Sequence, residues 1–378
     1  MNDINLENLS YQDFCKIPLL TKDIIRNEGE SLLNRHYVNA NKAFKNTSGG
    51  STGEPVVFYR TQEQANHGMA NYYYALNLNG VNIYDVSVDL WGAERDMYNT
   101  KSKFNFRSFF NNKFALNTFV LSDEIIEDYV KRLNKIRPKF IKAYVHSIYD
   151  IAKFINRHGI SISFKPIIHC TTGPLYPEMR LEIARAFNNA RVYNFYGSRE
   201  VSAIASETLK DNGMSVLFDN VFVEVLDQDG IPVKKGEEGD IVITTLNNFY
   251  MPLIRYKIGD RAIKGDEIDF GTLKLDTVKG RTLGVILKKD GTKIDGQFFT
   301  TLFFHKSSIK SFQLIQKSID LLELSIVKSS TYEERELNEI VERIKKEVPD
   351  ADIKITFCEK ISLTSTGKIM YVYSLLES

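Results

Sequence analysis

Two hydrophobic periods alternate along the first half of the chain. Short apolar runs, typical of buried strands, alternate with segments whose apolar residues recur every three or four positions, as on one face of a helix. The predicted strands are Val56–Tyr59, Val86–Leu90, Lys139–Val145, Pro166–Thr171 and Arg191–Phe195, and the predicted helices begin at Thr61, Ser122, Ile148 and Pro177. This alternation predicts an α/β fold in which helices cover a mainly parallel sheet.

The pattern changes after Val216. Short β-prone runs, Val221–Leu226 and Asp240–Leu246, are separated by glycine-containing turns, which predicts a small antiparallel β subdomain. The last ~95 residues follow the order strand, helix, strand, strand, helix, strand, which predicts a separate C-terminal α+β domain. Its clearest helix is Thr331–Val348, with acidic residues in the first turn, lysines in the last turn and a proline beyond.

A loop rich in glycine and hydroxyl groups, Thr47–Pro55, precedes the strand at Val56. Glycines let a backbone approach a ligand closely, and hydroxyl and N–H donors suit anionic oxygens, so the loop is a candidate phosphate site. A flexible linker is the alternative, but a linker would not usually run straight into a strand. The loop lacks the lysine of a kinase-type phosphate loop. A phosphate bound there would therefore need positive charge from elsewhere.

Three later polar loops are also candidates, because ligands of open α/β sheets bind beyond the carboxyl ends of strands. In Tyr196–Glu200 the ring could stack on a base, the arginine could bind a phosphate and the glutamate a hard cation, or the segment is an ordinary turn. Asp260 follows a glycine and could accept hydrogen bonds from a ribose diol, or the pair is only a turn. Lys368 could deliver charge to a phosphate or carboxylate, or is solvated like most lysines.

Charge and cysteine usage narrow the class of partner. The 378-residue chain has a net charge of +1. It therefore lacks the large positive charge that is typical of nucleic-acid-binding proteins. Cys15, Cys170 and Cys358 have neither disulfide-framework nor zinc-site spacing. The N-terminus lacks a signal-peptide pattern, and no stretch is long and apolar enough to span a membrane. We therefore expect a cytoplasmic protein with small-molecule partners.

In their order along the chain, these loops resemble the motifs of the ANL superfamily of adenylate-forming enzymes. The matching segments are Ser48–Pro55, Tyr196–Glu200, Gly259-Asp260, Gly280-Arg281 and Thr366-Gly367-Lys368. The framing sequences Ile17–Lys22, Gly173–Pro177 and Met251–Tyr256 look most like the branch of phenylacetate–coenzyme A ligases and CapK-type capsule proteins. The resemblance covers nearly the whole chain. It implies an N-terminal nucleotide- and carboxylate-binding domain (residues 1–280), a hinge (281–285) and a small mobile C-terminal lid domain (286–378).

The resemblance implies that a carboxylate attacks the α-phosphate of ATP, releasing pyrophosphate. The acyl-adenylate would then pass to coenzyme A, or to an amine or hydroxyl of a sugar or carrier. Carried over onto this sequence, catalytic roles fall to Lys368, Glu200 and Arg199, with Glu200 as the Mg²⁺ ligand. The implied nucleotide-binding positions are Ser48, Gly49, Gly50, Ser51, Thr52, Gly53, Gly173, Asn194, Phe195, Tyr196, Gly197, Ser198, Asp260 and Arg281. A nucleotide-binding protein without catalysis is the alternative, against which the retained carboxylates and lysine argue.

The chain departs from the family pattern at three places. Val56 replaces a common lysine, Arg199 a threonine, and Leu283 a hinge aspartate, which puts the usual hinge chemistry in doubt. The segment that precedes the glycine-rich loop is short, so we expect a shortened or remodelled N-terminal subdomain, and a homodimer could cover the exposed surface. The carboxylate pocket is expected near Trp91 and residues 144–147, although aromatic or histidine side chains there could equally belong to the core.

Overall fold

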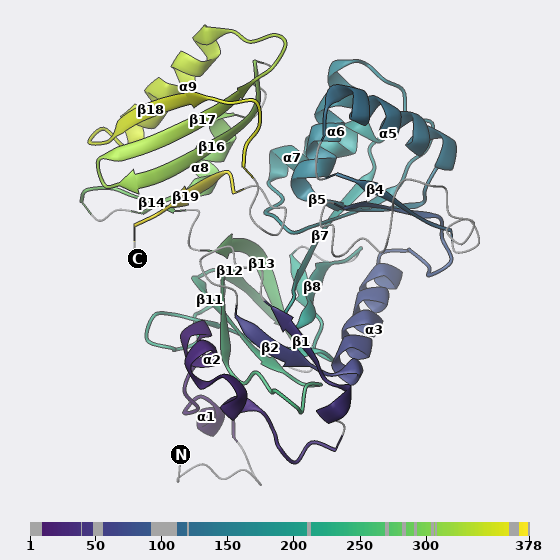
Figure 1. The fold of residues 1–378 in the computed structure, drawn as a ribbon, viewed down its shortest axis with the longest axis vertical. Coiled ribbons are helices and arrows are strands. Elements are labelled where there is room, and N and C mark those ends of the chain that lie inside the picture. Colours follow the sequence, from purple (N-terminus) through teal and green to yellow (C-terminus); the bar gives the residue numbers. More distant parts are fainter. Residues whose placement is uncertain are drawn as a thin grey trace.

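The computed structural model describes residues 10–38, 40–47, 56–91, 112–118, 121–209, 213–268, 272–281, 285–290, 293–303, 306, 308–362 and 370–376. Within these residues, the N-terminal part is built on an 11-stranded sheet with the order β10-β11-β12-β13-β9-β8-β7-β6-β5-β3-β4 (Figure 1). Its strands are β3 (Ser87–Trp91), β4 (Lys113–Asn117), β5 (Phe140–Tyr144), β6 (Ile167–Thr171), β7 (Arg191–Ser198), β8 (Ser202–Glu207), β9 (Met214–Val216), β10 (Val221–Leu226), β11 (Glu238–Thr245), β12 (Tyr256–Ile268) and β13 (Thr272–Arg281).

Strands β3 to β7 pair in parallel, which confirms the parallel sheet predicted from the alternating pattern. Strand β7 is parallel to β6 on one side and antiparallel to β8 on the other. The predicted antiparallel strands are present, and they continue the same sheet because β7 belongs to both halves. The turn between β7 and β8 therefore lies where the sheet changes from parallel to antiparallel pairing.

Helices cover both faces of the parallel strands. α5 (Asp123–Ile136), α6 (Val145–Arg157) and α7 (Pro177–Ala186) share a buried apolar cluster with one face, and α3 (Gln62–Leu78) packs on the other. The predicted caps are confirmed, because the Thr61 hydroxyl accepts from the Gln64 N–H and the Ser122 hydroxyl from the Ile125 N–H. Helix α6 begins three residues earlier than predicted, since β5 runs directly into it.

The N-terminal segment folds onto the antiparallel strands. It contains α1 (Tyr11–Phe14), α2 (Lys22–Glu28), the 3₁₀ turns η1 (Gly29–Leu32) and η2 (Ala40–Lys42), and the antiparallel pair β1 (Phe44–Thr47) and β2 (Val57–Arg60). In that pair Thr47 lies opposite Val57. The two ends of the glycine-rich loop are therefore held side by side, as in a hairpin loop and not as in a linker between separate units. Residues 48–55 of the loop lie outside the described residues.

The C-terminal part has its own sheet and core. Its elements are β14 (Val285–Leu287), β15 (Lys293–Asp295), α8 (Gly296–Leu302), β16 (Ile309–Ser318), β17 (Leu321–Lys328), α9 (Glu334–Glu347), β18 (Asp352–Phe357) and β19 (Val372–Ser374). The sheet order is β18-β17-β16-β19, and α8 and α9 contribute to its apolar cluster. The predicted order of elements is confirmed, with added short strands at either end. Helix α9 starts three residues after the predicted Thr331. The exact domain and hinge boundaries stay predictions, as does the homodimer.

The two parts meet where α6 faces β16 (Figure 1). The Lys153 Nζ donates to the Lys310 carbonyl at 3.0 Å, and the Lys310 Nζ lies 3.1 Å from Asp123 Oδ1. Tyr371 packs against the apolar clusters of both parts. The two cores are thus joined through a contact that combines polar and aromatic groups.

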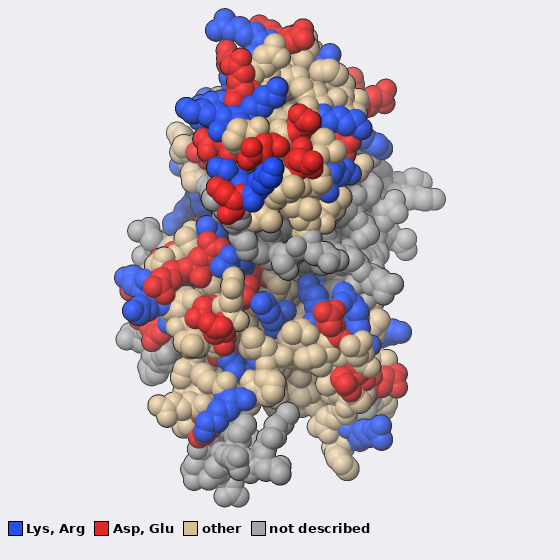
Figure 2. Space-filling view, turned by 90° about the vertical axis from the view of Figure 1, so that its left-hand side faces the viewer, with Lys and Arg blue, Asp and Glu red and all other residues tan. Residues whose placement is uncertain are grey.

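Surface charge is mixed. Basic and acidic side chains are interspersed on the face that Figure 2 shows, in keeping with the net charge of +1. Among the described residues, no helix is long and apolar enough to cross a membrane. The three cysteines are free, with Cys170 buried and the other two partly buried.

Candidate functional site

The end of β7 and the tight turn into β8 form the centre of the site. Tyr196, Gly197 and Ser198 close β7, and the chain reverses at once into β8, where Ser202 takes a φ of +66°. A Cβ at Gly197 would lie 2.6 Å from the Ser202 carbonyl oxygen. Only glycine fits this close approach of two backbones. The Ser198 hydroxyl accepts from the Val201 N–H at 3.3 Å and so fixes the turn from inside.

Tyr196 connects two of the predicted motifs across the sheet. Its hydroxyl donates to Asp260 Oδ2 at 2.7 Å, although the two residues are 64 positions apart. Asp260 in turn lies opposite Arg281 in the pairing of β12 with β13. The structure therefore brings the Tyr196–Glu200, Gly259-Asp260 and Gly280-Arg281 motifs together at one place, with a carboxylate oriented by a phenol.

Glu200 is deeply placed for a carboxylate. Its side chain is only 4% exposed, and its Oε1 lies 3.5 Å from the Tyr256 hydroxyl. Its backbone carbonyl accepts from the Gln64 side chain at 3.3 Å. Burial lowers the pKa of the Arg60 guanidinium, and the charge of Glu200 partly offsets this by raising it. Glu200 is thus a buried carboxyl group that accepts a hydrogen bond from a phenol and interacts electrostatically with the Arg60 guanidinium.

Sequence reasoning missed Arg60 and Gln64. Arg60 ends β2, just beyond the glycine-rich loop, and donates to the Arg199 carbonyl at 3.4 Å and to the Ser202 hydroxyl at 2.5 Å. Its Nε also donates to the Gln64 side chain at 3.0 Å. These contacts fasten β2 and the start of α3 to the β7–β8 turn. The signal that could have found them is an arginine at the end of a predicted strand, four positions before a glutamine in the first turn of a predicted helix.

Asn194 and Phe195 occupy β7 just before the turn. The Asn194 N–H donates to Glu207 Oε2 at 2.8 Å, and Glu207 forms a bidentate pair with Arg180 at 2.8 and 2.6 Å. The Phe195 ring packs edge-on against His169, with ring centroids 4.8 Å apart. Its side chain is therefore directed to the sheet face under α3. Gly173, an exposed residue two positions beyond β6, lies at the same carboxyl edge of the sheet.

Glu200 is the carboxylate that the sequence singled out as a metal ligand. Among them, no group of three or more His, Cys, Asp or Glu side chains could hold a metal ion. A lone Glu200 carboxylate is compatible with Mg²⁺, which usually binds one or two carboxylates and takes its other ligands from water and substrate phosphates. The predicted positions 48–53 and Lys368 lie outside the described residues, as does Leu283.

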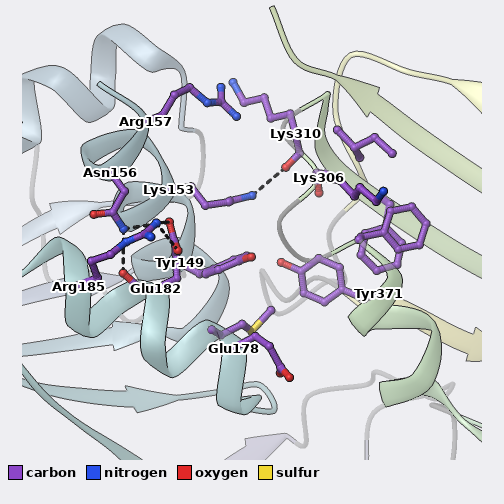
Figure 3. A pocket seen from close by; sticks show the side chains of 15 residues that line it. Tyr149, Lys153, Asn156, Arg157, Glu178, Glu182, Arg185, Lys306, Lys310 and Tyr371 are labelled. Carbon is purple, nitrogen blue, oxygen red and sulfur yellow. Dashed lines mark hydrogen bonds and ion pairs between the residues drawn. The ribbon is translucent and has the colours of Figure 1, made fainter. Parts of the chain in front are cut away.

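A cavity of about 330 Å³ lies away from these motifs, between the two parts of the molecule (Figure 3). Tyr149, Lys153 and Arg157 of α6 line one side, and Lys310 and Tyr371 line the other. Figure 3 shows the two tyrosine side chains extending toward one another across it. None of the predicted site residues that the structure describes lines this cavity. It belongs to the contact between the two parts and not to the β7–β8 turn.

Comparison with known proteins gives matches in sequence and fold. Residues 286–374 match the family model described as the CapK C-terminal domain. Protein CapK of Staphylococcus aureus is 26% identical over 381 residues, covering 97% of this chain and 81% of the relative. A phenylacetate-coenzyme A ligase of Thermus thermophilus is 26% identical over 146 residues, 37% of this chain and 33% of the relative.

Two solved ligases share the fold. 2-Hydroxyisobutyryl-CoA ligase in the postadenylation state, in complex with R3-HIB-AMP, superposes with a TM-score of 0.70 at 17% identity, covering 97% of this chain and 81% of that one. An anthranilate CoA ligase in complex with anthranoyl-AMP gives a TM-score of 0.62 at 15% identity, covering 86% and 64%. With the first of these structures, the similarity of fold extends over both parts of this chain.

Proposed function

On the premise that this chain is an ANL-like, CapK-type protein, we propose that it activates a carboxylic acid with ATP. The products of this step are an acyl-adenylate and pyrophosphate, and the acyl group is then transferred to an acceptor. The observation that carries the proposal is the Tyr196–Asp260 hydrogen bond of 2.7 Å, which joins two of the motifs at one edge of the sheet. The pairing of Asp260 opposite Arg281 brings the third motif to the same place. The similar ligases of known structure hold acyl-AMP molecules, which supports the same chemistry here.

The charges of the site suit a reaction between two anions. Attack of a carboxylate on a phosphate needs alignment and charge neutralisation more than acid–base help. In this proposal Asp260, oriented by Tyr196, accepts hydrogen bonds from the ribose hydroxyls, and Arg281 lies beside it. Gly173, Asn194 and the backbone of the β7–β8 turn line the adenine and the α-phosphate. Arg199 adds positive charge where family members carry a threonine.

Glu200 is the proposed Mg²⁺ ligand. When bound, the ion would neutralise phosphate charge and orient the leaving pyrophosphate. The chain's own contribution is to keep the Glu200 carboxylate in place, through the Tyr256 hydroxyl and through Arg60, which also fastens the neighbouring backbone. A single buried carboxylate fits an ion whose remaining ligands come from phosphates and water.

The glycine-rich loop and Lys368 complete the proposal. Residues 48–53 would grip the β- and γ-phosphates, as donors without a charge of their own. The two ends of the loop are held together by the β1–β2 pair, which suits a loop that closes around a ligand. Lys368 would bridge the carboxylate and the α-phosphate, so that the C-terminal part must be docked for adenylation and must move for transfer.

The Lys368→Ala variant separates the two half-reactions. We expect the rate of adenylation to fall by at least about 100-fold, because an electrostatic contact to the reacting oxygens is removed. Transfer from a supplied acyl-adenylate should be kept. Pyrophosphate release and consumption of the adenylate measure the two steps. Lys360→Ala, which removes an exposed lysine of the same C-terminal part, is the matched control and should change neither. Equal loss of both steps in Lys368→Ala would assign the lysine a different role.

Coenzyme A is the proposed acceptor, since the similar solved structures and the partial sequence match are CoA ligases. By contrast, the relative that matches over most of the chain is a CapK protein, and the C-terminal family model is also of the CapK type. This favours an amine or hydroxyl of a sugar or carrier as the second candidate acceptor. Adding coenzyme A after the adenylate has formed distinguishes them. A thioester in the mass spectrum supports the first, and an adenylate that persists unchanged supports the second.

A further inference from the structure

The sheet face under α3 carries a row of polar side chains. Asp89, Lys142 and His169 occupy directly opposed positions on β3, β5 and β6. Their neighbours within each strand point the other way, into the apolar cluster with α5 to α7. Parallel strands covered by helices usually carry apolar side chains on both faces. Burying charged side chains in this place is unfavourable unless each has a partner of opposite charge or a hydrogen-bond partner.

Lys142 presents its ammonium to the space between the sheet and α3. Its Nζ lies 4.4 Å from the centroid of the Trp91 ring and 5.1 Å from that of Tyr72. None of the ion pairs between described residues includes Lys142. Aromatic faces stabilise a cation only in part. The ammonium is therefore held in position by two rings without a carboxylate bound to it in the described part of the chain.

Asp89 does not fully offset this charge. Burial raises the pKa of the Asp89 carboxyl, while the charges of Lys142 and Lys113 lower it. Lys113 is an exposed residue whose Nζ donates to the Tyr73 hydroxyl at 3.0 Å. Among the described residues, the face thus carries two lysines and one aspartate. One further negative charge on a bound molecule would balance the row.

His169 adds a neutral polar atom next to the ammonium. It is 2% exposed, and burial lowers its pKa to about 3, so the ring is uncharged at neutral pH. Its Nε2 has no hydrogen-bond partner among the described atoms. Buried polar atoms of native proteins are nearly always paired, so an unpaired one indicates a place for a ligand or water.

The row of Asp89, Lys142 and His169 lies next to the carboxyl ends of the strands, where the nucleotide is proposed to bind. Lys142 is two residues before the end of β5, and Trp91, which ends β3, packs against Tyr144 with ring centroids 4.2 Å apart. Phe195, one residue before Tyr196, packs against His169 at 4.8 Å. An acid whose carboxylate sits at the strand ends would therefore direct its far end toward Lys142.

We propose that Lys142 selects carboxylic acids that carry a second anionic group at their far end; this inference rests on the proposed adenylation. A second carboxylate would form a charge-assisted contact with the ammonium and balance the row. A plain hydrocarbon tail would cover the ammonium without replacing its solvation, which is costly. Lys142 is thus a specificity residue and takes no part in the chemical step.

Matched acids test the proposal. Monocarboxylic and dicarboxylic acids of equal chain length are compared by acid-dependent pyrophosphate release, with wild type, Lys142→Met and Lys142→Arg. We expect wild type to favour the diacid by about 10-fold in kcat/KM, a difference of about 1.4 kcal/mol. Lys142→Met should lose that preference, and Lys142→Arg should keep most of it. Lys139→Met is the matched control, since Lys139 lies just before the other end of the same strand and pairs with Asp85 at 2.8 Å.

Several outcomes would overturn the assignment. One such outcome is a wild type that favours monoacids. Another is a Lys142→Met variant whose kcat/KM falls equally for both acids while its melting temperature is unchanged. Either result would mean that Lys142 serves only as a structural counter-charge. Calorimetric binding of the diacid to wild type and to Lys142→Met gives a readout that needs no turnover. Diacid binding that depends on Lys142 without any pyrophosphate release would keep this inference and reject the proposed adenylation. Diacid binding independent of Lys142 would reject the inference itself.

Discussion

At the scale of single residues, the site depends on groups that orient one another. Tyr196 fixes Asp260, and Arg60 ties the backbone next to Glu200 to β2. In each case a group proposed to act at the nucleotide is held by a hydrogen bond from a side chain on another strand. Such support determines how much of the binding free energy is lost to ordering the site when ligand arrives.

Removing the Tyr196 hydroxyl should weaken nucleotide binding. In Tyr196→Phe the Asp260 carboxylate loses a charge-assisted hydrogen bond of 2.7 Å, and we expect the Kd for ATP to rise about 10-fold. Tyr193→Phe is the matched control on the same strand, because the Tyr193 hydroxyl has no hydrogen-bond partner among the described atoms. Titration calorimetry compares the two. An equal change in both variants would mean that Asp260 is positioned by something else.

His169 should make stability depend on pH. Its pKa is lowered by burial from 6.5 to about 3, so below pH 6.5 the unfolded chain takes up a proton that the folded chain does not. The contribution of the neutral ring is thus complete above pH 6.5 and is lost as the pH falls toward 3, by about 1.4 kcal/mol per unit.

Urea unfolding at roughly pH 7, 6 and 5 measures this dependence. The slope of unfolding free energy against pH should be smaller in His169→Gln than in wild type. His158→Gln, which replaces an exposed histidine at the end of α6, should keep the wild-type slope. Identical slopes in all three proteins would show that His169 is protonated in the folded state.

At the scale of elements, one buried ion pair fastens the N-terminal segment to the sheet. Arg255 and Glu224 have side chains 3% and 2% exposed and pair at 3.1 Å. The Arg255 guanidinium also donates to the carbonyls of Cys15 and Ile17 at 2.5 and 2.7 Å. A single side chain therefore connects α1, β10 and the start of β12.

Breaking this pair should destabilise the fold strongly. Arg255→Met leaves Glu224 buried without its counter-ion, and we expect a loss of about 3–5 kcal/mol in the free energy of unfolding. The double variant Arg255→Met with Glu224→Leu should recover part of that loss, because no charge remains buried. Chemical denaturation measures both. A double variant less stable than the single one would mean that the carbonyl contacts, and not the ion pair, dominate.

Local signals in the sequence were enough for most elements. A hydroxyl before an apolar period marks the starts of α3 and α5, because a cap acts within one turn. The start of α9 was placed too early, since no side chain caps that helix at Glu333. The Tyr196–Asp260 bond joins residues 64 positions apart, and no local pattern encodes it. Resemblance to a family named both residues, but only the fold brings them together.

At the scale of the whole molecule, the contact between the two parts is made of polar and aromatic groups. It combines the Lys153–Lys310 hydrogen bond, the Lys310–Asp123 ion pair and the packing of Tyr371 around an open cavity (Figure 3). The same similar ligase gives TM-scores of 0.70 in its postadenylation state and 0.57 in its thioesterification state. Tyr371 follows Lys368 by only three residues, so this contact is well placed to influence the proposed lysine.

Weakening the contact should change the two half-reactions unequally. In Lys153→Ala with Tyr371→Ala we expect adenylation to fall about 10-fold while transfer from a supplied adenylate is kept, because less of the protein is docked. Small-angle scattering should give a larger radius of gyration than wild type. Lys354→Ala, on the outer strand β18, is the control. Equal effects on both half-reactions with unchanged scattering would mean that the contact does not govern docking.

Magnesium-dependent exchange of labelled pyrophosphate into ATP tests the central claim most directly, because it reports reversible adenylate formation without requiring the acceptor. Across a panel of aryl, fatty, amino, sugar and dicarboxylic acids, we predict exchange that depends on at least one acid and that is lost in Lys368→Ala. Folded protein that binds ATP but supports no exchange with any acid would contradict the account and identify a nucleotide-binding protein without catalysis.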